Sequence, residues 1–151
     1  MTDTKSGFSA DERAAMKQRA AEIRADKGLK GAAKTAKEYE DCIAAIDALT
    51  GIDKEVAVTL HQIVADVAPD LAPKTWYGFP TYAKDGKVVV FYQPAAKFKT
   101  RYGTVGFQDA AQLDDGAMWA VTYAVVEVTD AVRAKLRDLV ATAAGAPEER
   151  A

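Results

Sequence analysis

The spacing of the apolar residues changes once along this chain, and that change most constrains the fold. Before Pro69, apolar side chains recur every three or four residues, which is typical of helices with one buried face. Further on, two segments rich in β-branched and aromatic residues, 77–82 and 87–93, flank Asp85-Gly86, a strong hairpin signal. Helices followed by antiparallel strands favour an α+β fold over alternating parallel units.

The first predicted helix starts at a capping box. The Ser9 hydroxyl and the Glu12 carboxylate can each accept a hydrogen bond from the backbone amide of the other residue. This helix is expected to end at Gly28, and its apolar stripe is narrow, so intrinsic propensity supports it more than burial does. We therefore expect two parts: an N-terminal accessory helix with a linker over 1–30, and the main domain over 31–151.

The main domain is expected to begin with an antiparallel pair of helices over 35–49 and 53–67, with Asp53 capping the second helix. Strands are predicted near 77–82, 87–93, 99–107 and 120–128, followed by a helix over 131–144 that Thr129 or Asp130 caps. The fold class is therefore predicted as an α+β two-layer sandwich. It has an antiparallel sheet of four or more strands, helices mainly on one face, and the accessory helix.

The strand over 87–93 carries large apolar side chains on both faces. Val90 is expected to point to one face, and Val89 and Phe91 to the other. Helices cover one face only. The second face is expected to be covered by the loop over 107–119, by a partner subunit or by a ligand.

Charge and residue counts exclude several classes of protein. Twenty Lys and Arg against twenty-two Asp and Glu give a formal charge of −2, so no general field attracts nucleic acid or anionic lipid. One Cys and one His exclude a disulfide framework and a zinc site made of Cys and His. The polar N-terminus and the lack of a long apolar run predict neither a signal peptide nor a membrane span, and a cytoplasmic location is expected.

Cys42 and His61 invite a nucleophile-and-base interpretation. However, Cys42 lies in the buried stripe of its helix, where an apolar setting keeps a thiol protonated and inert. His61 lies at the edge of the next helix's stripe. A core cysteine and a boundary histidine are therefore favoured over a catalytic dyad, and an enzyme is the less favoured function.

The densest group of unusual residues covers 76–82, where Gly78 and Pro80 mark an irregular strand edge. Aromatic packing at a sheet corner is one interpretation, and a ligand pocket lined by these rings is the other. The candidate ligand-binding residues are Trp76, Tyr77, Phe79, Tyr82, Lys97, Arg101, Trp119 and Tyr123.

Carboxylates offer a weaker candidate, a site for a hard metal ion. Such ions need several oxygen ligands that converge, whereas most acidic side chains are simply solvated. The candidate metal ligands are Glu38, Asp41, Asp114 and Asp115.

The motif over 76–82, the hairpin at 85–87, the segment 91–98 and the strand over 123–129 together resemble the YdhG-like bacterial family, a domain of unknown function. The resemblance covers about 39–143. It implies a small frataxin-like α+β sandwich. One family member is described as an iron chaperone that serves iron-sulfur and haem assembly, so the resemblance implies iron as a ligand.

Three functions remain open. The first is a non-enzymatic binding domain, for a small-molecule ligand or, as the resemblance implies, for iron. The second is a protein-interaction module or homodimer that uses the second sheet face or the N-terminal helix. The third is an enzyme that acts on a small molecule in an aromatic pocket.

Overall fold

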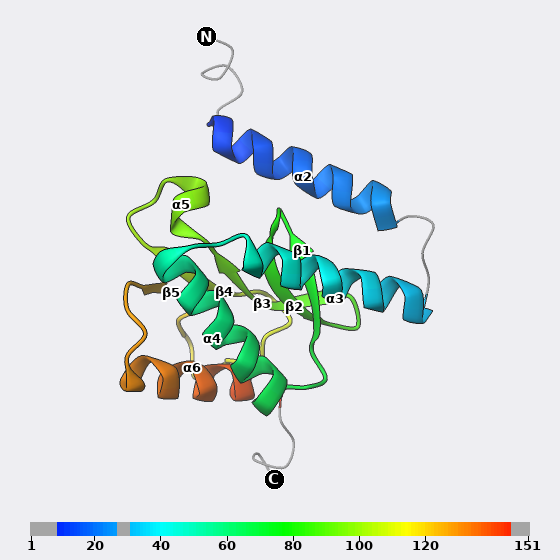
Figure 1. Ribbon diagram of the computed structural model, residues 1–151. Coiled ribbons are helices and arrows are strands. Elements are labelled where there is room, and N and C mark those ends of the chain that lie inside the picture. Colours follow the sequence, from blue (N-terminus) through cyan, green and yellow to red (C-terminus); the bar gives the residue numbers. More distant parts are fainter. Residues whose placement is uncertain (1–8, 27–30, 146–151) are drawn as a thin grey trace.

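The computed structural model describes residues 9–26 and 31–145 (Figure 1). The expected helix end at Gly28 and the N-terminal residues 1–7 lie outside these ranges. The described elements are α2 (Ala10–Asp26), α3 (Gly31–Asp47), α4 (Gly51–Val67), β1 (Ala72–Trp76), β2 (Phe79–Lys84), β3 (Lys87–Gln93), α5 (Ala95–Phe98), β4 (Gly103–Phe107), β5 (Thr122–Val125) and α6 (Asp130–Ala143). No helix in the described part of the chain is long and apolar enough to cross a membrane. The predicted α+β fold class is confirmed.

The five strands form one antiparallel sheet in the order β1-β2-β3-β4-β5, so each strand pairs with its neighbours in sequence. The predicted start of the strand at 77–82 was wrong, because β2 begins at Phe79. Instead, Trp76 pairs with Phe79, and Tyr77 and Gly78 form the turn between β1 and β2 with φ angles of 55° and 83°. Two positive φ angles suit a two-residue hairpin, but a tyrosine adopts one rarely, so the sequence does not mark this turn.

The ends of two helices are as predicted. The Ser9 amide donates to Glu12 Oε1 at 2.9 Å and the Glu12 amide donates to Ser9 Oγ at 3.0 Å, which completes the capping box of α2. Thr129 caps α6, because its side-chain oxygen accepts a hydrogen bond from the Val132 amide at 3.1 Å. These local signals depend only on neighbouring residues.

The prediction that Asp53 caps α4 was wrong. Thr50 is the N-cap residue of α4, and the Asp53 carboxylate is directed toward α5 instead. Its Oδ1 accepts hydrogen bonds from the Tyr92 hydroxyl at 2.6 Å and the Ala95 amide at 2.8 Å, and its Oδ2 accepts one from the Ala96 amide at 3.0 Å. Asp53 is only 3% exposed. A buried carboxylate with three donors therefore ties α4, β3 and α5 together.

The core lies between the sheet and three helices. Figure 1 shows α3, α4 and α6 on one side of the sheet, with α2 set apart at the top of the view. Tyr82, Val90 and Tyr92 face the helices as members of the buried core cluster. Val89 was expected on the other face but belongs to the same cluster, because the register shifts between Tyr82 and Ala83 and leaves Val89 without a partner in β2.

Deleting residues 1–30 is expected to leave the main domain folded, because the core cluster of the described residues includes none from α2. The loss in free energy of unfolding should stay below about 3 kcal/mol, and urea denaturation should remain cooperative. Loss of the cooperative transition would show that α2 is part of the main fold. The division into two parts stays a prediction until this experiment is done.

Candidate functional site

Five aromatic residues gather on the sheet face that the three core helices leave uncovered. This aromatic cluster consists of Trp76, Tyr77, Phe79, Phe91 and Phe98. Alternation along β2 and β3 explains the placement, because neighbouring residues point to opposite faces of a sheet. Although Phe79 is only 4% exposed, it is not a member of the core cluster beneath the helices. The protein therefore has a second, smaller apolar centre.

Half of the six ring pairs within the aromatic cluster pack edge to face, and the other half are tilted. The Trp76 ring centroid lies 6.0 Å from that of Phe79 at 82° and 5.6 Å from that of Phe91 at 69°. Phe79 and Phe91 lie 5.4 Å apart with their planes at 32°, and the ring of Phe98 is inclined at 66° to Phe79. A Cβ atom at Gly106 would overlap the Phe91 ring, so glycine at this position of β4 leaves room for it.

A pocket of about 420 Å³ lies between the aromatic cluster and α2. From α2 it is lined by Glu12, Ala15 and Met16, and two glutamines, Gln93 and Gln108, complete the lining. Ala15 is 2% exposed, whereas Met16 is 43% exposed. The helix α2 thus roofs the pocket with one small, buried side chain, Ala15, and two longer ones.

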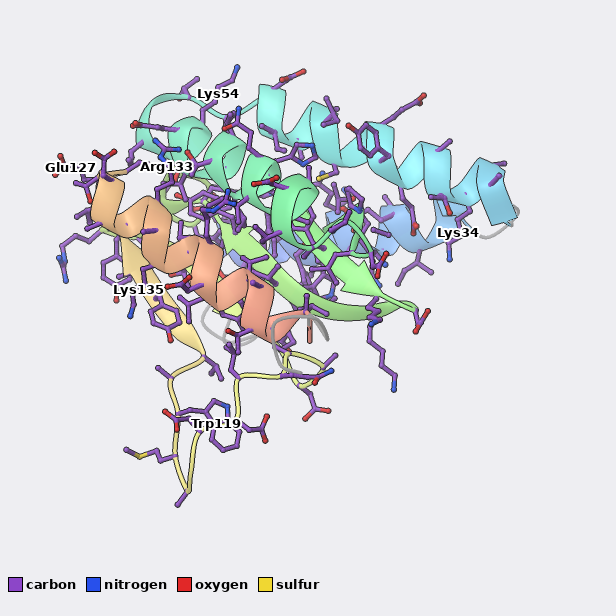
Figure 2. All side chains as sticks on the ribbon, turned by 90° about the horizontal axis from the view of Figure 1, so that it is seen from below. Lys34, Lys54, Trp119, Glu127, Arg133 and Lys135 are labelled. Atoms are coloured by element: carbon purple, nitrogen blue, oxygen red, sulfur yellow. The ribbon has the colours of Figure 1, made fainter. Side chains whose placement is uncertain are left out.

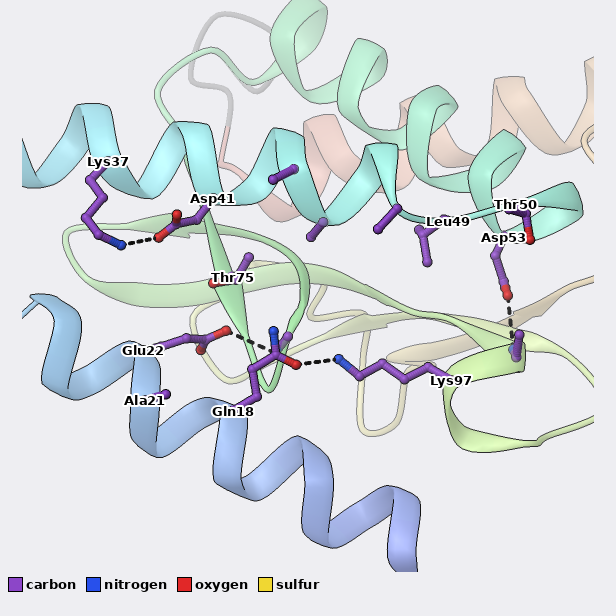
Figure 3. Close-up of a pocket in the computed structure, with 15 residues that line it drawn as sticks. Gln18, Ala21, Glu22, Lys37, Asp41, Leu49, Thr50, Asp53, Thr75 and Lys97 are labelled. Atoms are coloured by element: carbon purple, nitrogen blue, oxygen red, sulfur yellow. Dashed lines mark hydrogen bonds and ion pairs between the residues drawn. The ribbon is translucent and has the colours of Figure 1, made fainter.

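Polar contacts hold α2 in this position. The Gly78 amide donates to Glu22 Oε2 at 3.1 Å, and Lys97 Nζ donates to Gln18 Oε1 at 2.9 Å (Figure 3). Lys99 of the loop after α5 lies 3.6 Å from the Asp11 carboxylate. The first contact places α2 against the turn that follows Trp76, and the other two place it against α5.

A second cavity, of about 800 Å³, lies between α2 and α3 (Figure 3). Charged side chains of both signs line it, including Lys37, Asp41 and Lys97. Burial lowers the pKa of Lys97, and the nearby Glu22 carboxylate partly opposes that shift. Because both signs of charge already meet one another here, this cavity favours no single class of ligand.

The structure divides the predicted ligand-binding residues among several places. Trp76, Tyr77 and Phe79 come together in the pocket as proposed. Tyr82 does not, because it points to the helical face and is fully buried there. Lys97 lines the neighbouring cavity. The Arg101 guanidinium lies over the ring of its neighbour Tyr102 at 5.0 Å and does not line the pocket.

Sequence reasoning missed two members of the aromatic cluster. The expected alternation around Val90 placed Phe91 on the second face, yet it was not assigned to the pocket. Phe98 was not assigned to the pocket either. Its position became visible only with the short helix α5, which brings it 6.0 Å from Phe79 between ring centroids.

Trp119 and Tyr123 lie in a third hollow, of about 430 Å³, away from the aromatic cluster. Asp114 and Asp115 line the same hollow, together with Lys135 of α6, whose Nζ lies 5.7 Å from the centroid of the Tyr123 ring. Figure 2 shows Trp119 on a loop that extends away from the body of the molecule. The structure therefore joins four candidate residues that the sequence had assigned to two different sites.

The four candidate metal ligands do not form one site. Glu38 lies 3.8 Å from Lys74 Nζ, and Asp41 accepts a hydrogen bond from Lys37 at 2.7 Å, so each of these two carboxylates on α3 has a lysine partner. Asp114 and Asp115 lie in the third hollow. Among the residues that the structure describes, no group of three or more His, Cys, Asp or Glu side chains could hold a metal ion.

Cys42 and His61 both contact the hydroxyl group of Tyr82 rather than each other. Cys42 Sγ donates to the Tyr82 oxygen at 3.9 Å, and His61 Nδ1 lies 3.0 Å from that oxygen. Cys42 has no exposed surface, and burial raises its pKa from 9.0 to about 11, whereas burial lowers the pKa of His61. A buried, protonated thiol fits the predicted structural role.

The Cys42 thiol is expected to stay unreactive in the folded protein at about pH 8, and to react with Ellman's reagent once the protein is unfolded in guanidinium chloride. Because its pKa is raised in the folded state, Cys42 contributes its full stability below about pH 9, and that contribution declines above it, where the unfolded chain loses the proton that the folded chain keeps. That contribution should be lost as the pH rises to about 11. Cys42→Ala should flatten the decline, and rapid labelling of the native protein would contradict this account.

Comparisons of the chain with protein-family models, with curated proteins and with solved structures find no match. The YdhG-like and frataxin-like resemblance therefore stays a prediction. The candidate site rests on the geometry of the aromatic cluster.

Proposed function

We propose that this protein is a non-enzymatic binding domain whose ligand site is the pocket between the aromatic cluster and α2. The observation that carries the proposal is the pocket of about 420 Å³, which has five aromatic side chains in its lining. Small-molecule sites are usually concave and mostly apolar, with a few polar groups that orient the ligand. Gln93, Gln108 and Glu12 are such polar groups here.

The location of the pocket also supports binding. Its floor is the sheet face opposite the main core, so the aromatic side chains are not needed to join the sheet to α3, α4 and α6. Its roof is a helix that contributes Glu12, Ala15 and Met16 to the lining and is held by polar contacts such as the bond from Lys97 to Gln18. A roof attached in this way can shift to admit a ligand without disturbing the main core.

Iron handling and catalysis have less support. Iron handling needs carboxylates that converge, and Glu38 and Asp41 each pair with a lysine instead. An enzyme needs a nucleophile, a base and an orienting group near a cavity. Cys42 is buried beneath the helices and has a raised pKa, so it does not serve as a nucleophile.

A neutral apolar dye, N-phenyl-1-naphthylamine, tests this function directly. We expect its fluorescence to rise and to saturate at one dye per chain, because the pocket excludes water from the dye. Trp76→Ala should weaken binding at least about tenfold, since it removes the largest ring of the lining. Trp119→Ala is the matched control, because Trp119 lies in the third hollow, and it should leave binding unchanged. Equal effects of the two substitutions would refute the proposed site.

A further inference from the structure

The charges around the pocket indicate the class of ligand. Of the residues that line it, Glu12 is the one whose side chain is charged at neutral pH, and its charge is negative. The faces of aromatic rings also carry negative potential. Among the residues that the structure describes, the lining therefore combines five aromatic side chains with one carboxylate and no lysine or arginine.

The angles between the rings suit a compact cation. Trp76 stands at 82° to Phe79 and at 69° to Phe91, whereas Phe79 and Phe91 lie at 32° to each other, so the face of Trp76 points in a different direction from theirs. Aromatic cages that hold ammonium groups need such an arrangement, in which several ring faces lie within about 6 Å of the cation. A flat stack of parallel rings would suit a planar neutral ligand better.

The cationic side chains nearest to α2 have other partners. Lys97 Nζ donates to Gln18 Oε1 and lines the neighbouring cavity, and Lys99 pairs with Asp11. Neither lysine lines the pocket, so neither neutralises its lining. The rings and Glu12 therefore give the described lining a negative potential, although Glu12 Oε1 also accepts a hydrogen bond from the Ser9 amide.

We infer that this pocket binds an organic cation with a methylated or quaternary ammonium group, held by the partly exposed rings of Trp76 and Phe91 with Glu12 at the side of α2. The inference rests on the proposed function and narrows it to one chemical class. The group occurs in small molecules such as choline and in the trimethyl-lysine side chain of a protein. The structure identifies the chemistry that both share.

Calorimetry with choline and with its neutral isostere 3,3-dimethylbutan-1-ol isolates the contribution of the charge. Choline should bind about threefold to thirtyfold more tightly, the range that cation–π attraction supplies. Glu12→Gln should weaken binding of choline but not of the alcohol. The glutamine oxygen can still accept from the Ser9 amide, so the capping box is kept. Trp76→Leu should reduce the preference for choline, whereas Trp119→Leu should not.

A peptide with one trimethyl-lysine, compared with the same peptide unmethylated, distinguishes the two sources. Binding of choline alone supports a free small molecule, and tighter binding of the methylated peptide supports a protein partner. Equal binding of choline and the alcohol, or binding of neither, overturns the inference. If the naphthylamine dye still depends on Trp76 in that case, the proposed binding function stands and only the ligand class is wrong. If the Trp76→Ala substitution also leaves dye binding unchanged, both the proposed binding function and the ligand class are wrong.

Discussion

Asp53→Ala is expected to lower the free energy of unfolding by about 3–5 kcal/mol, because it leaves one buried donor and two partly buried donors without their acceptor. These donors are the Tyr92 hydroxyl and the amides of Ala95 and Ala96. Burial, and secondarily the bond to Asp53, raises the pKa of Tyr92, so the hydroxyl remains a donor at neutral pH. Urea denaturation of the variant measures the loss.

A surface aspartate provides the matched control for that substitution. Asp66 pairs with Arg137 at 2.6 Å but is 61% exposed in its side chain, so Asp66→Ala should cost less than about 1 kcal/mol. Asp53→Asn should fall between the two, since it keeps one acceptor oxygen. A loss below about 1 kcal/mol for Asp53→Ala would contradict the role assigned to this carboxylate. Because Asp53 also holds α5, and α5 carries Phe98, the same variant should weaken dye binding.

Phe79→Ala is expected to cost about 3–5 kcal/mol, the usual result of emptying a buried aromatic site. Phe79 is 4% exposed and contacts the rings of Trp76, Phe91 and Phe98. Trp76→Ala should cost less stability, because its ring is only half-buried at the side of the pocket, while it should reduce binding more. Equilibrium unfolding and dye titration of both variants give the two quantities. Equal stability losses would mean that the aromatic cluster is packing alone.

Most of the fold could be predicted from local patterns. The change in apolar spacing, the capping box at Ser9 and the cap at Thr129 depend on neighbouring residues and are reproduced in the structure. Of the features that were missed, one depends on residues far apart in the sequence and another on an unusual backbone conformation. Asp53 accepts from amides more than forty positions away, and the turn at Tyr77 uses a residue type that rarely adopts positive φ.

Only the part of the candidate site that is formed by residues close in sequence could be predicted. Trp76, Tyr77 and Phe79 are close in sequence, so their proximity in space follows from one turn and one strand pair. Trp119 is separated from them by two strands of the meander, and its distance could not be inferred from its residue type. The roof over the pocket was not predicted either, because Ala15 gives no sign in the sequence that it is buried.

The accessibility of Trp76 tests the central claim, that the aromatic cluster lines a binding pocket, most directly. In a Trp119→Phe variant, Trp76 is the single tryptophan and its fluorescence can be quenched with acrylamide. The pocket predicts that acrylamide quenches Trp76 in the free protein and that saturating N-phenyl-1-naphthylamine protects it. Complete protection of Trp76 without the dye, or quenching that the dye does not change, would contradict the claim.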